Sequence, residues 1–128
     1  MRIYVKSFGL KYGGNLTLGP GPSAFVFDLR MLQNPHNIPE LRYKRGTDQE
    51  IIDNLEKFPS TEELFRDILN FIYKIVVFAK YYDRTQLIFW FSCYGGHHRS
   101  VYFAEKVGEA LKKFGYEVLV EHRDLYKD

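Results

Sequence analysis

Four segments of the chain carry the hydrophobic patterns of β-strands. In the first, Ile3 and Val5 alternate with more polar neighbours, which is the two-residue period of a strand with one buried face. The third is continuously apolar from Leu87 to Phe91, a pattern typical of a central strand covered on both faces. The predicted strands are residues 2–8, 24–29, 87–91 and 116–121.

Helical patterns follow in the middle of the chain. Asp48 is a suitable N-cap for a short helix that ends near Lys57. Ser60 and Glu63 fit the S-x-x-E capping box, and the apolar side chains of residues 64–79 then recur at helical spacing in a broad stripe. We therefore predict a short helix followed by the longest helix of the protein, which packs against a sheet.

A third helix is predicted over residues 99–114, with Gly115 placed to end it. This helix joins the last two strands, and such a crossover connects parallel strands with a right-handed turn. The breaker-rich residues 11–22 and the proline-containing residues 34–39 are predicted loops. The order of elements predicts a single α/β domain, residues 1–128, with a mixed or mainly parallel sheet flanked by helices.

Composition narrows the class of protein. The 128 residues are 45% hydrophobic and 27% charged, as in a folded domain, and the net charge of +2 is too balanced to indicate nucleic-acid binding by itself. Residues 1–14 lack a signal-peptide pattern, and no stretch reaches the roughly 20 apolar residues of a membrane span. We expect a cytoplasmic protein without membrane contact. A single cysteine and four scattered histidines predict no internal disulfide, metal site or cofactor.

The most informative segment is the predicted strand-to-helix turn at residues 93–100, which reads CYGGHHRS. Gly95 and Gly96 allow a tight bend that turns successive N–H groups toward one point, which the positive end of the following helix also faces. Arg99 can add a two-pronged contact to phosphate oxygens, and His98 a further donor. We therefore predict an anion-binding loop here, with His97 exposed to solvent.

The same octet fits C-x-x-G-x-x-R-S, the signature of cysteine-dependent phosphatases. In that family the loop amides and the arginine hold the phosphate while the cysteine thiolate attacks phosphorus. Cys93 and Arg99 would then be catalytic. However, Ser92 stands where those enzymes usually have histidine, and no separate aspartate-containing loop is an obvious general acid. We therefore rank a structural, half-buried Cys93 above a catalytic one and assign no catalytic residue.

Other candidates follow from the position of the loops. Ligands of open α/β sheets gather beyond the carboxyl ends of the strands, where Arg30 and Arg42 are expected near the turn at residues 93–99. Asp28 and Asp124 stand at strand ends and could orient arginines there, although plain salt bridging is the favoured interpretation.

Lys11 next to Tyr12 has the charge and stacking partner of a nucleic-acid contact. A solvated loop lysine is the favoured interpretation, because residues 11–22 are rich in glycine and proline.

Along nearly its whole length the chain resembles the C-terminal domain of the RapZ family, the RNase adapter proteins. The matching segments occur in the family's order and are Ser7–Gly13, Phe25–Arg30, Asn34–His36, Pro39–Arg42, Gly46–Asp48, Cys93–Val101 and His122–Leu125. The resemblance implies recognition of a phosphorylated amino sugar, glucosamine 6-phosphate in the best-known members, together with binding of small RNA and a ribonuclease.

The resemblance also implies a set of ligand-binding residues. They are His36, Tyr94, Gly95, His98 and Arg99, to which the turn itself adds Gly96 and Ser100. Tyr94 stands where the family usually has threonine. The chain shows neither the G-x-x-x-x-G-K-[ST] loop of full-length members nor the enterobacterial basic tail, so we do not expect ATP binding and expect only weak RNA binding.

Taken together, the sequence predicts a sensor or adapter module that binds a phosphorylated small molecule. A phosphatase and an RNA-binding module are the alternatives. The protein partner and the oligomeric state stay open, and a homo-oligomer is compatible with the sequence.

Overall fold

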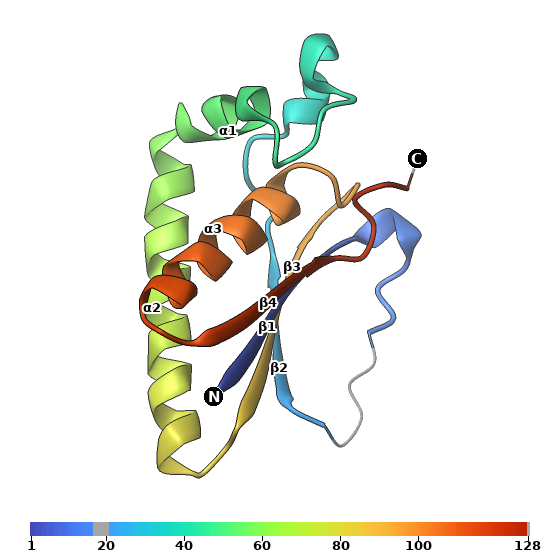
Figure 1. The fold of residues 1–128 in the computed structure, drawn as a ribbon. Helices are drawn as coiled ribbons and strands as arrows, with labels where there is room; N and C mark the ends of the chain where they lie inside the picture. Colours follow the sequence, from blue (N-terminus) through green and yellow to red (C-terminus); the bar gives the residue numbers. More distant parts are fainter. Residues whose placement is uncertain (17–20, 128) are drawn as a thin grey trace.

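Four parallel strands form one sheet in the computed structural model, which describes residues 1–16 and 21–127 (Figure 1). The strands are β1 (Arg2–Gly9), β2 (Ser23–Asp28), β3 (Gln86–Cys93) and β4 (Glu117–His122). Their order across the sheet is β2-β3-β1-β4. The predicted α/β fold is confirmed, and every strand pairing among the described residues is parallel.

The strand positions agree with the hydrophobic patterns. β3 lies between β2 and β1, as its continuous apolar run predicts, and Phe89 and Phe91 are completely buried. The strand–helix–strand unit at the end of the chain joins β3 to β4 in parallel, but β1 is inserted between them.

Three helices accompany the sheet: α1 (Gln49–Glu56), α2 (Pro59–Tyr81) and α3 (Arg99–Lys113). Figure 1 shows α2 and α3 on the same side of the sheet. Alternate strand side chains such as Val5 and Phe89 form the core with Ile72 of α2 and Phe103 of α3. Within the described chain, no helix combines the length and the apolar character that crossing a membrane requires.

The helix starts differ from the predicted caps. Asp48 is the N-cap of α1, but its carboxylate accepts the Arg45 amide at 2.7 Å and makes no cap bond to α1. The predicted capping box of Ser60 and Glu63 is wrong, because α2 begins earlier, at Pro59, whose fixed φ suits the first helical position. The predicted helix end is confirmed, since Gly115 follows α3 with φ of +89°.

Two of the predicted loops contain short 3₁₀ turns. Residues 34–39 were expected to be irregular, but Pro35–Asn37 forms one turn and Pro39–Leu41 another, each with proline at its start. A further turn covers Leu10–Tyr12, and residues 17–20 of the same predicted loop lie outside the described residues.

The carboxyl ends of three strands meet at one edge of the sheet. Gly9 at the end of β1 pairs with Cys93 at the end of β3, while Asp28 at the end of β2 pairs with Ser92. The loops that follow these strands therefore lie together, and this edge is the place where open parallel sheets bind ligands.

Candidate functional site

The turn between β3 and α3 packs against the end of β1. A Cβ atom on Gly9 would lie 2.5 Å from the carbonyl carbon of Gly95, and one on Gly96 would lie 2.6 Å from the Gly9 nitrogen. Gly96 also has φ of +76°, a conformation that favours glycine. The glycine pair therefore forms a tight turn, as predicted, and two backbones approach too closely there for any side chain.

A cavity of about 380 Å³ opens beside this turn and is called the basic cavity below. Its lining residues are Lys11, Asn34, His36, Arg42, Tyr43, Arg45, Cys93, Tyr94, Gly95, His97, His98 and Arg99. The lining contains four lysine or arginine side chains and three histidines, and the described residues contribute no carboxylate to it. Such a lining favours an anion.

A second, wider groove of about 550 Å³ lies over α1 and α3. Its lining mixes the carboxylates of Glu56, Glu105 and Glu109 with the ammonium groups of Lys106 and Lys112. This balance of charges gives it no preference for an anion, so the basic cavity is the better candidate site.

Arg99 uses only part of its guanidinium within the protein. Its Nη1 donates to the carbonyl oxygens of Arg30 at 2.9 Å and Leu32 at 3.0 Å, which anchors the loop after β2. The side chain is only 3% exposed, and its Nε has no hydrogen-bond partner among the described residues. Burial lowers the pKa of Arg99, but a guanidinium stays charged at neutral pH. The Nη1 atom of Arg99 therefore holds the loop after β2, while its Nε has no acceptor among the described residues.

His98 lines the cavity with one ring nitrogen already occupied. Its Nε2 lies 2.7 Å from the carbonyl oxygen of Lys44, and because a carbonyl only accepts, Nε2 must donate. Burial lowers the pKa of His98 to about 4, so the ring is neutral at neutral pH. In this tautomer Nδ1 carries no proton, and His98 offers an acceptor where the sequence suggested a donor.

His97 is half-buried and lines the cavity, so the expectation that it is solvent-exposed is wrong. Its Nε2 is buried without a hydrogen-bond partner among the described residues. Desolvation lowers the pKa of His97. The ring lies beside Tyr12, with the two ring centroids 6.4 Å apart.

Two cationic residues of the cavity were not selected from the sequence. Lys11 is exposed, as the favoured interpretation predicts, and it also lines the cavity, where its amide donates to the Tyr94 carbonyl at 3.0 Å. No local pattern distinguishes Arg45, which belongs to the basic segment Arg42–Arg45. Its neighbour Gly46 donates to the His97 carbonyl at 2.6 Å, and this contact brings Arg45 to the site.

The remaining predicted residues fall into two groups. His36 and Arg42 line the cavity together, and Arg42 Nε donates to the His36 carbonyl at 3.1 Å. Asp28 and Arg30 are not part of the lining and form an exposed ion pair at 2.7 Å. The hydrogen bond from Arg30 lowers the pKa of Asp28.

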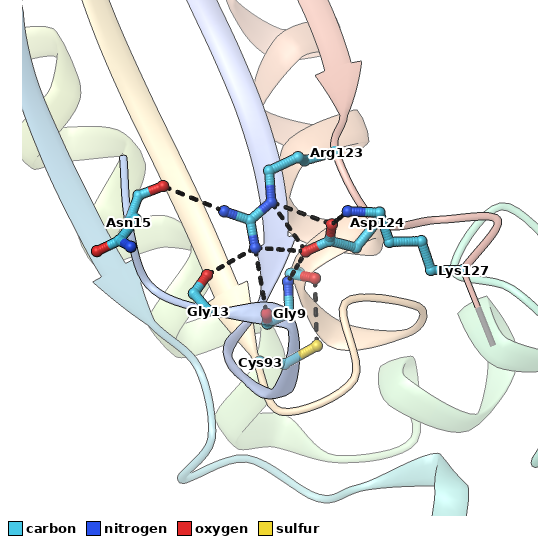
Figure 2. A network of polar contacts seen from close by, with 8 residues as sticks. Gly9, Gly13, Asn15, Cys93, Arg123, Asp124 and Lys127 are labelled. Carbon is cyan, nitrogen blue, oxygen red and sulfur yellow. Dashed lines mark hydrogen bonds and ion pairs between the residues drawn. The ribbon is translucent and has the colours of Figure 1, made fainter. Parts of the chain in front are cut away.

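Asp124 connects the end of β1 to the segment that follows β4 (Figure 2). This fully buried carboxylate accepts the Gly9 amide at 2.7 Å and pairs with Arg123 and Lys127. Arg123 continues to the Gly13 carbonyl at 2.7 Å. Burial alone would raise the pKa of Asp124, but the hydrogen bonds from Arg123, Lys127 and Gly9 outweigh it and lower the pKa to about 2. The salt-bridging interpretation of Asp124 is confirmed, with Arg123 and Lys127 as partners.

Cys93 and Ser100 stand at the two ends of the turn. Cys93 is 2% exposed and belongs to the cavity lining, and its Sγ lies 3.2 Å from the Ser100 Oγ. In residues 1–16 and 21–127, no group of three or more His, Cys, Asp or Glu side chains is arranged to hold a metal ion.

Comparison with known proteins yields one family. The profile of the RapZ C-terminal domain matches residues 1–126. A nucleotide-binding protein of Pseudomonas fluorescens (strain Pf0-1) is 41% identical over 121 residues, which are 94% of this chain and 41% of that protein. A nucleotide-binding protein of Thermotoga neapolitana is 39% identical, with 98% of this chain and 43% of that protein covered. The chain thus spans less than half the length of these relatives.

Proposed function

The chain belongs to the RapZ C-terminal domain family, and from this premise we propose that its basic cavity binds a phosphorylated small molecule, with an amino-sugar phosphate such as glucosamine 6-phosphate as the preferred ligand. The domain then acts as a sensor that differs between a ligand-free form and a ligand-bound form.

The observation that carries the proposal is the set of unpaired cationic and ring nitrogens around the cavity. Arg45 Nε, His97 Nε2 and Arg99 Nε are buried and have no hydrogen-bond partner among the described residues. Arg45 Nε and Arg99 Nε are N–H donors, and burying such a donor without an acceptor costs about 1–3 kcal/mol, with a higher cost for charged groups. A phosphate supplies several acceptor oxygens and the charge that the lining lacks.

The mouth of the cavity suits a polyhydroxylated group. His36, Asn34 and Tyr94 offer polar atoms there, and the unprotonated Nδ1 of His98 can accept a hydrogen bond from a hydroxyl or an ammonium. A sugar phosphate therefore finds partners at both of its ends, whereas inorganic phosphate uses only the cationic part.

The relatives are named nucleotide-binding proteins, and this suggests a nucleoside monophosphate as the competing ligand. Its phosphate would use the same cationic groups, and exposed Tyr43 could stack on the base. The two ligands share the phosphate monoester, so only a direct comparison separates them.

RNA and a ribonuclease are further proposed partners, on the resemblance to the adapter family. With a net charge of +2, any RNA complex of this chain should depend on a few cationic groups and be lost at moderate salt.

Isothermal titration calorimetry tests the proposal. The chain is titrated with glucosamine 6-phosphate, glucose 6-phosphate, adenosine monophosphate and inorganic phosphate at one pH and ionic strength. We expect affinity to fall in the order amino-sugar phosphate, sugar phosphate, inorganic phosphate. Equal affinities would show that the cavity recognises only charge, tighter binding of adenosine monophosphate would favour a nucleotide, and no binding of any phosphate would refute the site.

A further inference from the structure

Cys93 is a group that ligand binding alone does not require. Its thiol lies in the lining of the basic cavity, six positions before Arg99 and seven before Ser100. The Ser100 hydroxyl is 3.2 Å from the Cys93 sulfur, close enough to donate a hydrogen bond to a thiolate. Of the two glycines in the turn that carries these residues, Gly95 belongs to the cavity lining and Gly96 packs against Gly9.

Arg99 supplies the second, independent observation. Its side chain is only 3% exposed, and its Nη1 is fixed by the carbonyls of Arg30 and Leu32. The guanidinium is thereby oriented, while its Nε lacks a partner among the described residues. A rigid cation with an unused donor beside a sulfur nucleophile is the arrangement that holds a phosphoryl group during in-line attack.

We propose that Cys93 accepts the phosphoryl group of a phosphate monoester bound in this cavity, which makes the chain a slow phosphomonoesterase. The inference rests on the proposed function, because it requires the same phosphate position. It goes beyond that function because it assigns a covalent step to a residue that a sensor does not need.

The reaction has two steps. The Cys93 thiol gives its proton to solvent, the resulting thiolate attacks phosphorus and forms an S–P bond, and the P–O bond to the leaving group breaks, so that the leaving group takes the electron pair. Water then attacks phosphorus, the S–P bond breaks, both protons of the water leave with the released phosphate as H2PO4−, and the thiolate returns. The Ser100 hydroxyl stabilises the thiolate in its role as leaving group of the second step.

The lining also limits the substrate class. No carboxylic acid from the described residues lines the cavity, and His98 is neutral with its N–H used on Lys44. A poor leaving group such as a sugar alkoxide would need a proton that these groups do not provide. Aryl phosphates release a stable phenolate without one. Aryl phosphates are therefore the inferred best substrates, and sugar phosphates should turn over more slowly.

The experiment uses p-nitrophenyl phosphate with the unmodified chain, Cys93→Ser and Ser100→Ala. Release of p-nitrophenolate is followed by absorbance, and the phosphocysteine is sought by mass spectrometry after acid quenching. We expect turnover by the unmodified chain, loss of turnover in Cys93→Ser, and a slower rate with more trapped intermediate in Ser100→Ala. Arg66→Gln on the exposed face of α2, purified in the same way, is the control that keeps full activity.

A second readout does not depend on turnover. Because Cys93 is the single cysteine of the chain, its alkylation by iodoacetamide can be followed as one mass change, and inorganic phosphate in the cavity should slow it. Phosphate binding that leaves alkylation unchanged, or turnover that is equal in Cys93→Ser, would overturn the inference. If calorimetry detects phosphate binding but no p-nitrophenolate is released, the covalent step fails and the binding site stands. If no phosphate binds, both fail.

Discussion

The backbone of Gly9 touches the backbone of Gly96. A Cβ atom on Gly9 would lie 2.7 Å from the Gly96 nitrogen, and a Cβ atom on Gly96 would lie 2.6 Å from the Gly9 nitrogen. This contact joins the end of β1 to the turn that precedes α3. The turn at residues 93–99 is therefore held by a neighbouring strand rather than by its own sequence alone.

Substitution of either glycine should loosen this junction. Gly96→Ala adds a backbone clash to a left-handed conformation, and we expect it to lower the free energy of unfolding by about 2 kcal/mol or more, with Gly9→Ala similar. Gly95→Ala is the matched control, since its Cβ would meet only the His97 ring, at 3.7 Å. Urea unfolding of the three variants measures the effect. Equal midpoints for Gly95→Ala and Gly96→Ala would contradict the contact.

The carboxylate of Asp124 should be a main electrostatic contribution to stability. Asp124→Asn removes the negative charge and one of the two acceptor oxygens that Arg123, Lys127 and the Gly9 amide share, and we expect a loss of about 3 kcal/mol. The exposed pair of Asp28 with Arg30 is the comparison, and Asp28→Asn should cost about 1 kcal/mol or less.

The same carboxylate predicts an acid transition. The pKa of Asp124 is lowered to about 2 in the fold, below the ordinary value of 3.8, so its stabilisation is present above pH 3.8 and is lost as pH falls toward 2. Unfolding midpoints of the unmodified chain and Asp124→Asn should converge in this range. Curves that stay parallel down to pH 2 would count against the assignment.

Local signals explain what could be predicted. Alternating and continuous apolar runs marked all four strands, and the glycine pair marked the tight turn, because each signal lies within a few residues. The insertion of β1 between β3 and β4 depends on contacts between distant segments, which no local pattern encodes.

The composition of the cavity was harder to predict for the same reason. Arg45 reaches the lining because Gly46 packs on the start of α3, where a Cβ would lie 2.5 Å from the His98 carbonyl oxygen. The anchoring of Arg99 by the carbonyls of Arg30 and Leu32 likewise depends on the end of β2 lying beside β3. Neither of these contacts can be predicted from the spacing of residues in the sequence.

Arg45 separates binding from folding better than Arg99 does. Arg99→Ala removes the donor that anchors two carbonyls, so weaker binding in that variant could follow from a disordered loop. Arg45 Nη1 makes one bond, to the Tyr43 carbonyl, and its Nε is unpartnered among the described residues. Arg45→Gln should weaken every phosphorylated ligand by about 1.5–3 kcal/mol through loss of a charge-assisted contact. Calorimetry should show no change for Arg66→Gln, which removes the same charge from α2.

His98 should make the fold sensitive to mild acid. Its pKa in the fold is about 4, below the ordinary 6.5, so the neutral ring stabilises the protein fully above pH 6.5. Between pH 6.5 and 4 the unfolded chain binds a proton that the folded chain does not, and stability should fall by up to about 1.4 kcal/mol per pH unit. His98→Gln keeps a donor for the Lys44 carbonyl without titrating, and should show a shallower decline in urea unfolding. Identical slopes would exclude His98 as the cause.

His36 is the residue best placed to distinguish a sugar phosphate from free phosphate. It is exposed at the cavity mouth, and its backbone is held independently of the ring, since the amide donates to Asn34 Oδ1 at 3.2 Å and the carbonyl accepts from Arg42 Nε. His36→Ala should therefore keep the fold of its turn. Because the ring is exposed and does not belong to the buried unpartnered nitrogens, the variant should lose more affinity for glucosamine 6-phosphate than for inorganic phosphate.

The neighbouring Asn37→Ala is the control for this prediction, because Asn37 is exposed on the same turn but does not line the cavity. In Asn37→Ala, the ratio of the affinities for glucosamine 6-phosphate and inorganic phosphate should equal the ratio in the unmodified chain. A parallel loss of both ligands in His36→Ala would show that His36 acts on the phosphate position alone. The sugar would then have to be recognised by Asn34 or Tyr94, and substitution of these residues would become the decisive measurement.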